Sequence, residues 1–214
     1  MKHLHVTRLS VPDTPYELLQ ISKLLDTQSR EELEFAPWAE YPYKPEVHFS
    51  IAYDSKSVFL KYYVKEAETR AIYTEINDPV YRDSCVEFFI SLDGGLHYYN
   101  FEFNSKGTCL AGFGKNRDNR ELLSAELIKQ ISYLPTGHPE TADRSNSWEL
   151  CLMIPVEVFY NESACDLEGR SVKANFYKCG DDLAQPHFLA WNNIKSQKPN
   201  FHLPEYFGEL TFTA

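Results

Sequence analysis

The sequence predicts an all-β protein, specifically an antiparallel β-sandwich of the jelly-roll or immunoglobulin-like kind, with one or two short N-terminal helices. Apolar and polar residues alternate in many short segments, turn-forming residues separate these segments, and helical spacing occurs only near the N-terminus. Turn signals include residues 54–56, 93–95 and 105–107. The expected strands are 47–53, 57–64, 85–92, 98–104, 108–114, 147–154, 172–178 and 207–213.

The helical signal begins with a capping pattern. Thr14 stands at the expected N-cap, Pro15 at the first helical position, and Glu17 closes a capping box. The apolar residues that follow at helical spacing are Leu18, Ile21, Leu24 and Leu25. Ser29 and Glu32 predict a second short turn. We therefore expect one domain over residues 1–214, in which a helical segment, 1–37, packs on a β-sandwich, 38–214.

Length, charge and hydropathy exclude several classes of function. The chain has 214 residues and a formal net charge of -10, and it lacks the clustered Lys and Arg that bind nucleic acid or an anionic membrane. No apolar run approaches the roughly 20 residues that span a bilayer, which argues against membrane insertion. The N-terminus lacks the apolar region of a secretory signal. At face value the chain is cytoplasmic; an extracellular or periplasmic location requires a leader that has been removed.

The five cysteines are an odd number with wide spacing and contain no CxxC pair. This pattern indicates buried thiols rather than a disulfide framework or a zinc site, so no metal site is predicted from it. His3 and His5 form an HxH pair, which we expect to be solvated at a mobile terminus. Trp148 precedes an alternating apolar strand and is expected in the core, whereas Trp38 is expected to plug one end of the sandwich.

The segment 85–104 predicts a β-hairpin whose register can be worked out. If Gly94-Gly95 is a two-residue turn, residues equally distant from it face each other, and Glu87 lies opposite Glu102. One face of the hairpin is then apolar: Val86, Phe88, Ile90, Leu92, Tyr99, Phe101 and Phe103. The other face is polar enough to meet water or a ligand: Cys85, Glu87, Phe89, Tyr98, Asn100, Glu102 and Asn104.

Two opposed carboxylates repel unless a cation, a proton or a hydrogen-bond donor lies between them. Three interpretations remain open. Glu87 and Glu102 are exposed acids on a solvated sheet face, or they belong to a site in which Arg82 orients them toward sugar hydroxyls, or they are the two carboxylates of a glycosidase. Directly opposed Cβ atoms lie about 5 Å apart, which does not exclude a retaining hydrolase.

Other catalytic motifs are absent from the sequence. There is no GxSxG, HExxH, P-loop or GxGxxG pattern, and residues 107–114 are interpreted as a strand between turns. The pair Asp181-Asp182 stands in a turn, where a solvated role is expected, although carboxylates and carbonyls there are suitable for calcium. His202, before the final strand, is expected to be a hydrogen-bonded structural residue.

Four motifs in this order carry a resemblance to a known family. They are PW followed by VHFSIAYDSKSVFLKYYVKE, then YRDSCVEFFISLDGG, SWELCLMIP, and KCGDDLAQPHFLAWNNIKSQKPNFHLPEYFGELTF. From Trp38 to Phe212 the chain resembles the family 9 carbohydrate-binding modules, in particular the DOMON-like sandwiches of gut Bacteroidetes. The resemblance implies an antiparallel β-sandwich that binds carbohydrate without turning it over.

The resemblance also implies a set of ligand-binding residues. Modules of this family grip the end of a glycan between two tryptophans, helped by Arg, Glu, Gln and Asn side chains, because sugar C–H faces pack on aromatic rings. Trp191 is the candidate for one wall. No tryptophan lies between Lys65 and Arg82, so a tyrosine must supply the other. The expected ligand-binding residues are Trp191, Asn192, Asn193, Arg82, Tyr81, Tyr73, Glu87, Glu102 and Asn104.

Alternatives from other classes stay open. Glu87 and Glu102 are suitable for a glycoside hydrolase, and a haem- or redox-binding relative would need Met153 with His97 or His187. An interaction module with a vestigial pocket is a third alternative, in which Trp191 anchors its loop. The expected partner is a carbohydrate, with an associated glycoside hydrolase as a second. No cofactor is required, and calcium is the one that the resemblance leaves open.

Overall fold

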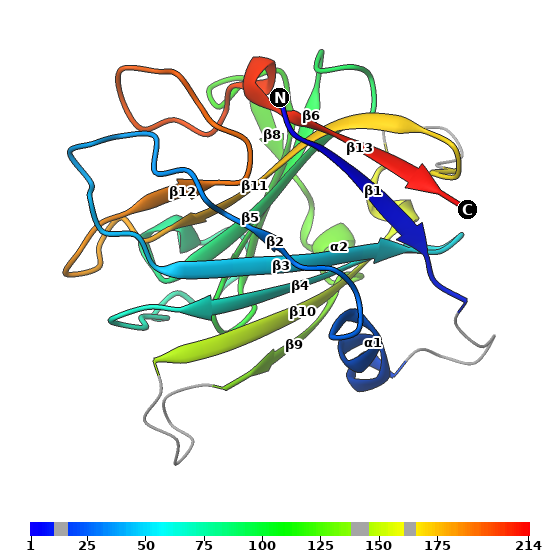
Figure 1. The fold of residues 1–214 in the computed structure, drawn as a ribbon, viewed down its shortest axis with the longest axis horizontal. Coiled ribbons are helices and arrows are strands. Elements are labelled where there is room, and N and C mark those ends of the chain that lie inside the picture. The colour runs from blue at the N-terminus through cyan, green and yellow to red at the C-terminus, as the bar shows by residue number, and fades with distance from the viewer. Residues whose placement is uncertain (11–16, 138–145, 161–165) are drawn as a thin grey trace.

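In the computed structural model, residues 1–10, 17–137, 146–160 and 166–214 are described, and they contain 13 strands that form one continuous curled sheet (Figure 1). The strands are β1 (His3–Arg8), β2 (Glu31–Glu32), β3 (Glu46–Tyr53), β4 (Ser57–Lys65), β5 (Cys85–Ser91), β6 (Tyr98–Asn104), β7 (Cys109–Gly114), β8 (Arg120–Leu122), β9 (Ser132–Thr136), β10 (Ser147–Pro155), β11 (Ser171–Cys179), β12 (Phe188–Ala190) and β13 (Gly208–Thr213). The α-helices are α1 (Leu18–Leu25) and α2 (Ala125–Ile128), and single 3-10 turns lie at Val80–Arg82, Val156–Val158 and Pro204–Tyr206.

The sheet has the strand order β8-β7-β6-β5-β11-β13-β1-β3-β4-β10-β9, with β12 beside β11 and β2 beside β3. It folds over so that the half β3-β4-β10-β9 packs against the half β8-β7-β6-β5-β11, while β13 and β1 join the two halves (Figure 1). The main core lies between the halves and includes Phe49, Leu60, Phe88 and Phe176. The predicted β-sandwich and all eight predicted strands are confirmed.

The N-terminal strand β1 was not predicted. It pairs in parallel with both β13 and β3, so the sandwich is not antiparallel throughout. Val6 is fully buried in the main core, and alternation along the strand leaves His3 and His5 outside. The expectation of a mobile terminus is therefore wrong, because β1 pairs with a strand on each side and buries Val6.

The rest of the N-terminal segment differs in part from the expectation. Helix α1 follows Glu17, and Ile21 and Leu25 pack on β3, β4 and β10. The predicted cap at Thr14 and Pro15 lies outside the described residues. In place of the predicted second turn, β2 pairs with β3, so the described part of 1–37 contains two strands as well as a helix.

The predicted hairpin register is confirmed. Glu87 lies opposite Glu102, and Phe88 lies opposite Phe101. The connection is longer than a two-residue turn, because β5 ends at Ser91 and β6 begins at Tyr98. The Asp93 carboxylate closes this loop by accepting hydrogen bonds from the backbone N–H groups of Leu96 and His97. The predicted register still holds because the connecting residues, 92–97, are centred on the same point as the predicted turn, between Gly94 and Gly95.

The polar face of the hairpin, which was expected to meet water or a ligand, is not exposed to bulk solvent. All of its residues are buried, because loops carrying a second apolar layer cover the outer face of β5, β6 and β11. That layer includes Trp38, Phe201 and Phe207. Trp38 therefore covers a sheet face instead of plugging an end, whereas Trp148 lies in the main core as predicted. The interpretation of Glu87 and Glu102 as exposed acids is wrong.

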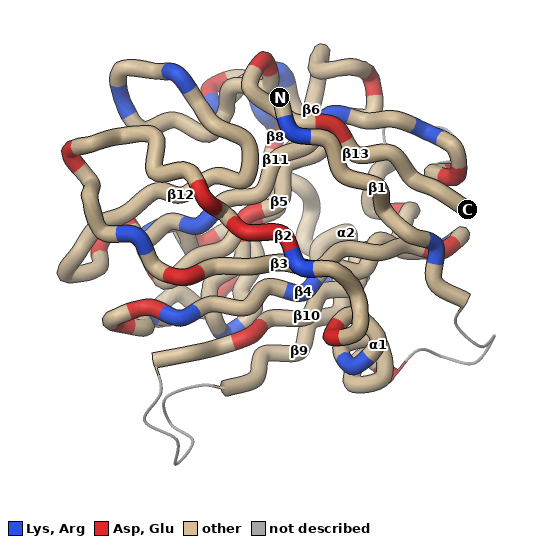
Figure 2. The backbone as a smooth tube through the Cα atoms, in the orientation of Figure 1, with Lys and Arg blue, Asp and Glu red and all other residues tan. Residues whose placement is uncertain are grey.

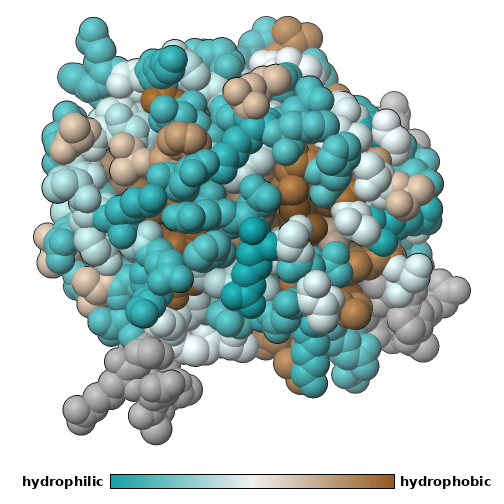
Figure 3. Space-filling model, viewed as in Figure 1, coloured by the Kyte–Doolittle hydropathy of each residue, from teal (hydrophilic) through white to brown (hydrophobic). Residues whose placement is uncertain are grey.

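The surface is charged and mainly hydrophilic on the side shown in Figures 2 and 3. Glutamates gather on and beside β2, where Glu34 forms an ion pair with Lys2 at 2.6 Å (Figure 2). No helix in the described ranges is long and apolar enough to cross a membrane. Four cysteines, Cys85, Cys109, Cys151 and Cys179, are buried free thiols as predicted, and Cys165 lies outside the described residues.

Candidate functional site

A cavity of about 270 Å³ lies between the outer face of the β5-β6-β11 half and the loops that cover it. Its floor is made by side chains of β5, β6 and β11, and its walls come from segments far apart in the sequence. The volume is close to the lower end of the range for small-molecule sites, about 300 Å³. The lining residues are Tyr81, Glu87, Glu102, Arg117, Arg120, Cys179, Asp181, Phe188, Pro199, Asn200, Phe201 and His202.

The floor of the cavity is built on the opposed pair Glu87 and Glu102. Both are almost completely buried, with 3% and 2% of their surface exposed. The Cys179 thiol donates a hydrogen bond to Glu87 Oε1 at 3.0 Å, and Asn100 Nδ2 donates to Glu102 Oε1 at 3.1 Å. Arg120 contributes the nearest cationic group, 3.9 Å from Glu102 Oε1. The pair can therefore exchange hydrogen bonds with a polar ligand in the cavity.

Burial governs the protonation of this pair. It raises the pKa of Glu87 well above its ordinary value, and the charge of Glu102 raises it further. Burial also raises the pKa of Glu102, to about 7, although Arg120 opposes the rise. At the mouth, burial and the neighbouring Asp182 raise the pKa of Asp181 to about 6. Near neutral pH the floor therefore holds at least one carboxylic acid, which can donate as well as accept hydrogen bonds.

Arg120 reaches the floor because β7 has no side chains in its path. Gly114 lies directly opposite Arg120, and Gly112 precedes it on the same face of β7. A Cβ atom at Gly114 would lie 2.5 Å from the Arg120 Cα, and one at Gly112 would lie 3.1 Å from its Cδ. The guanidinium therefore crosses β7 toward Glu102 on β6. The sequence Gly-Phe-Gly is the local signal for this arginine, and sequence reasoning assigned it no role.

His202 holds Arg120 in place. Arg120 Nη1 donates to His202 Nε2 at 2.9 Å, and His202 Nδ1 is 2.9 Å from the Tyr98 hydroxyl. A guanidinium only donates, so Nε2 is the acceptor and Nδ1 carries the proton that it shares with Tyr98. Burial and the charge of Arg120 lower the pKa of His202 to about 3, which keeps the ring neutral. The predicted structural role agrees with these bonds, although the ring also lines the cavity.

Aromatic rings form part of the walls. Phe201 stacks on Tyr177 with ring centroids 4.2 Å apart, and Phe188 meets Tyr41 edge to face at 4.8 Å. Tyr81 and Phe188 are half-buried, so both retain accessible ring surface at the cavity. Arg117 lies at the rim with most of its side chain in solvent. The cavity thus combines apolar walls with a polar floor and an arginine at its mouth.

Three of the nine predicted ligand-binding residues come together in this cavity: Tyr81, Glu87 and Glu102. Trp191 does not. Its side chain is 0% exposed in the main core, edge to face with Phe49 and Phe176, and its Nε1 donates to Glu31 Oε2 at 3.0 Å. A fully buried ring cannot stack on a sugar, so the prediction that Trp191 forms a ligand wall is corrected. Its aromatic character serves packing between the two halves of the sheet.

The other predicted residues also serve the protein itself or lie elsewhere. Asn192 bonds the backbone of Lys2 and Tyr206, and Asn104 bonds the Tyr73 carbonyl and Asp83. Asn193 lines a separate surface groove with Phe35, Ala36 and Pro37.

Arg82 is exposed and stands outside the lining of the cavity, 6.0 Å from the ring of Tyr81. Tyr73 is half-buried and likewise stands outside the lining. The arginines that line the cavity are Arg117 and Arg120, and neither was among the predicted ligand-binding residues. Calcium at Asp181-Asp182 stays a prediction.

Comparison with known proteins gives a consistent result. The family model described as carbohydrate-binding family 9 matches residues 18–212. A proposed carbohydrate-binding protein from Bacteroides uniformis ATCC 8492 has a crystal structure with TM-score 0.89 and 38% sequence identity, and the alignment covers 99% of each chain.

More distant structures share the fold. A family 9 carbohydrate-binding module from Caldicellulosiruptor kristjanssonii in complex with cellotriose has a TM-score of 0.62 at 13% identity, covering 99% of this chain and 94% of that one. A module from the same organism in complex with glucose has a TM-score of 0.58 at 13% identity, covering 99% and 95%. Among curated proteins, nothing matches this chain significantly.

Proposed function

Because this chain belongs to carbohydrate-binding family 9, we propose that it binds carbohydrate, without turning it over, in the cavity above Glu87 and Glu102. The ligand is one sugar unit, either a monosaccharide or the end of a glycan chain. One observation carries this assignment: the cavity combines half-buried aromatic rings with a buried polar floor. Trp191, which was predicted to form one wall of the sugar site, is buried in the core instead.

The arrangement matches the chemistry of a sugar ring. Pyranose C–H faces pack on aromatic planes, which Tyr81 and Phe188 provide. Hydroxyl groups both donate and accept hydrogen bonds, and a floor of two carboxyl groups offers both functions. Arg120 and Arg117 add donors on one side. With about 270 Å³ the cavity favours one ring over a longer segment, so specificity falls on a chain end or a free sugar.

Hydrolysis is a second candidate because the two carboxyl groups face each other in the cavity. Glycosidases use such a pair, with one group ionised or poised as a base while the other donates a proton. Chromogenic aryl glycosides test it directly. We expect no release of the chromophore by the wild type. Turnover that disappears in Glu87→Gln would establish an enzyme instead of a binding module.

A matched pair of arginine variants tests the site. Arg117→Ala removes a donor at the rim, and we expect it to weaken the best-binding sugar about tenfold, since a hydrogen bond to a charged group contributes about 1.5 kcal/mol or more. Arg82→Ala removes another exposed arginine, which does not line the cavity, and affinity should be unchanged. Calorimetric titration with glucose, cellotriose and a broader panel measures both.

Equal effects of the two variants, or a loss only in Arg82→Ala, would place the sugar outside the cavity. Both side chains are exposed, so neither change should alter the melting temperature, which serves as the control for folding.

A glycoside hydrolase is the partner that such a module would serve, because binding raises the local concentration of an associated enzyme at its substrate.

A further inference from the structure

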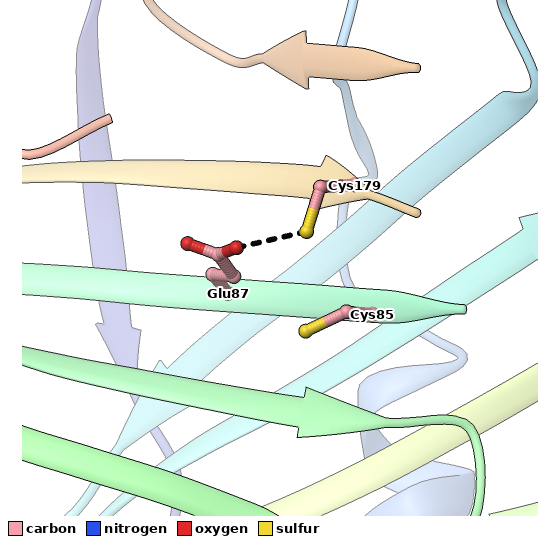
Figure 4. A group of neighbouring side chains, drawn as sticks. All are labelled: Cys85, Glu87 and Cys179. Carbon is pink, nitrogen blue, oxygen red and sulfur yellow. Dashed lines mark hydrogen bonds between the residues drawn. The ribbon is translucent and has the colours of Figure 1, made fainter. Parts of the chain in front are cut away.

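Two thiols and a carboxylate meet at the end of the cavity floor. Cys85 and Glu87 are alternate residues of β5 and therefore point to the same side of the sheet. Cys179 on β11 lies directly opposite Cys85. The two sulfur atoms and a Glu87 carboxylate oxygen all lie within 4.8 Å of one another. Figure 4 shows the Cys179 thiol on β11 directed at the Glu87 carboxylate on β5, and the Cys85 thiol beside Glu87 on the same strand β5.

This spacing is close to that of a metal site. Zinc binds sulfur at about 2.3 Å and carboxylate oxygen at about 2.0 to 2.2 Å, so ligands in a tetrahedral site lie roughly 3.5 to 4 Å apart. The Cys179 sulfur and Glu87 Oε1 are 3.0 Å apart without an ion, and neither sulfur is more than 4.8 Å from the other ligand atoms. Side-chain movements of about 1 Å would therefore bring the three ligand atoms to the spacing of a tetrahedral site. Calcium and magnesium prefer oxygen ligands, so the two thiols favour a thiophilic cation.

The surroundings give an ion a route and an open position. Glu87 and Cys179 line the cavity, so an ion can reach the cluster from solvent. Glu102, which lies opposite Glu87, lines the same cavity. Three protein ligands with a fourth position toward a cavity is the pattern of open zinc sites, in which water or a ligand takes that position. The other two described thiols, Cys109 and Cys151, do not belong to this group of close ligand atoms, and Cys151 lies in a separate cluster under α1.

We propose that Cys85, Cys179 and Glu87 bind one thiophilic divalent cation of the zinc class, with the fourth coordination position directed into the cavity. The site shares Glu87 with the floor of the proposed carbohydrate cavity, but its test requires no sugar and does not depend on which sugar binds. The sequence did not predict it because its two cysteines are 94 positions apart and meet only through the pairing of β5 with β11.

Cobalt is a suitable spectroscopic probe, because Co²⁺ bound to thiolates gives intense charge-transfer absorption in the near ultraviolet. We expect the reduced, chelator-treated protein to develop this absorption with one equivalent of Co²⁺, and one equivalent of Zn²⁺ to abolish it. Cys85→Ser and Glu87→Gln should each weaken Co²⁺ binding at least 100-fold. Cys151→Ser, which changes a buried thiol under α1, should leave it unchanged.

A measurement on the wild type alone keeps the proposal testable if a variant fails to fold. Under native conditions, bound Zn²⁺ should lower the rate at which a thiol reagent modifies Cys85 and Cys179, as located by peptide mass analysis, without changing the rate at Cys151. Identical rates with and without Zn²⁺, the absence of thiolate–cobalt absorption, or a Cys85–Cys179 disulfide that persists in reductant would each overturn the proposal.

Discussion

Replacing Trp191 with alanine is expected to lower the free energy of unfolding by about 3 to 5 kcal/mol, the range for large-to-small changes at fully buried aromatic residues. The indole is 0% exposed, contacts Phe49 and Phe176, and donates a hydrogen bond to Glu31. It also lies against Gly208, where an added Cβ would come within 2.4 Å of the ring. Urea denaturation monitored by circular dichroism measures the effect.

Trp191→Phe is the informative control. It keeps an aromatic ring but removes the indole N–H, so the cost should be smaller, about 1 to 3 kcal/mol, and the variant should stay folded. Sugar affinity should be unchanged, because Trp191 does not line the cavity. A folded Trp191→Phe protein that has lost its sugar would show that the indole contacts the ligand after a rearrangement, and the assignment of the cavity would be wrong.

The second large effect concerns a buried ion pair that joins the two halves of the sandwich. Lys178 Nζ on β11 lies 2.8 Å from Glu66 Oε2, at the end of β4, and both side chains are 0% exposed. Lys178 also donates to His187 Nε2 and to the Cys179 carbonyl, while Glu66 accepts from the Trp148 indole. Removing one partner leaves an uncompensated buried charge, so Lys178→Met should cost about 3 to 5 kcal/mol of unfolding free energy.

The double variant separates charge from packing. Glu66→Gln removes the charge left behind in Lys178→Met, so the double variant should be more stable than the sum of the single effects predicts, by at least about 1 kcal/mol. Chemical denaturation of the wild type, Lys178→Met, Glu66→Gln and the double variant measures the four free energies that this double-mutant cycle needs. Additivity within about 0.5 kcal/mol would mean that Lys178 and Glu66 do not interact energetically, and that the ion pair contributes only through the bulk of its side chains.

Strands and hairpin register could be predicted from the sequence because they depend on local alternation and turn residues. Glu87 was placed opposite Glu102 from the turn alone, and that pairing forms the floor of the cavity. Exposure could not be predicted in the same way. Whether a polar face meets water depends on loops that return from elsewhere in the chain, and here residues around Trp38 and Phe201 cover it.

The same limit explains the errors at the site. Trp191 follows a short strand beside two asparagines, as a binding loop would, but only the pairing of β12 with β11 shows that its ring turns into the core. Arg120 was missed because the space it crosses is created by glycines on the neighbouring strand. The proximity of Cys85 and Cys179 could not be predicted either, because the spacing of residues along the chain does not show which distant strands pair, and these two cysteines are 94 positions apart.

Amide hydrogen exchange with and without a saturating sugar tests the central claim most directly, because it locates the bound ligand without a variant. The loops over the cavity should exchange more slowly with the sugar present, in particular 199–202, 117–120 and the turn around Tyr81, while the groove beside Asn193 should not change. Protection confined to that groove, or no protection by any sugar of a broad panel, would contradict the assignment of this cavity as the carbohydrate site.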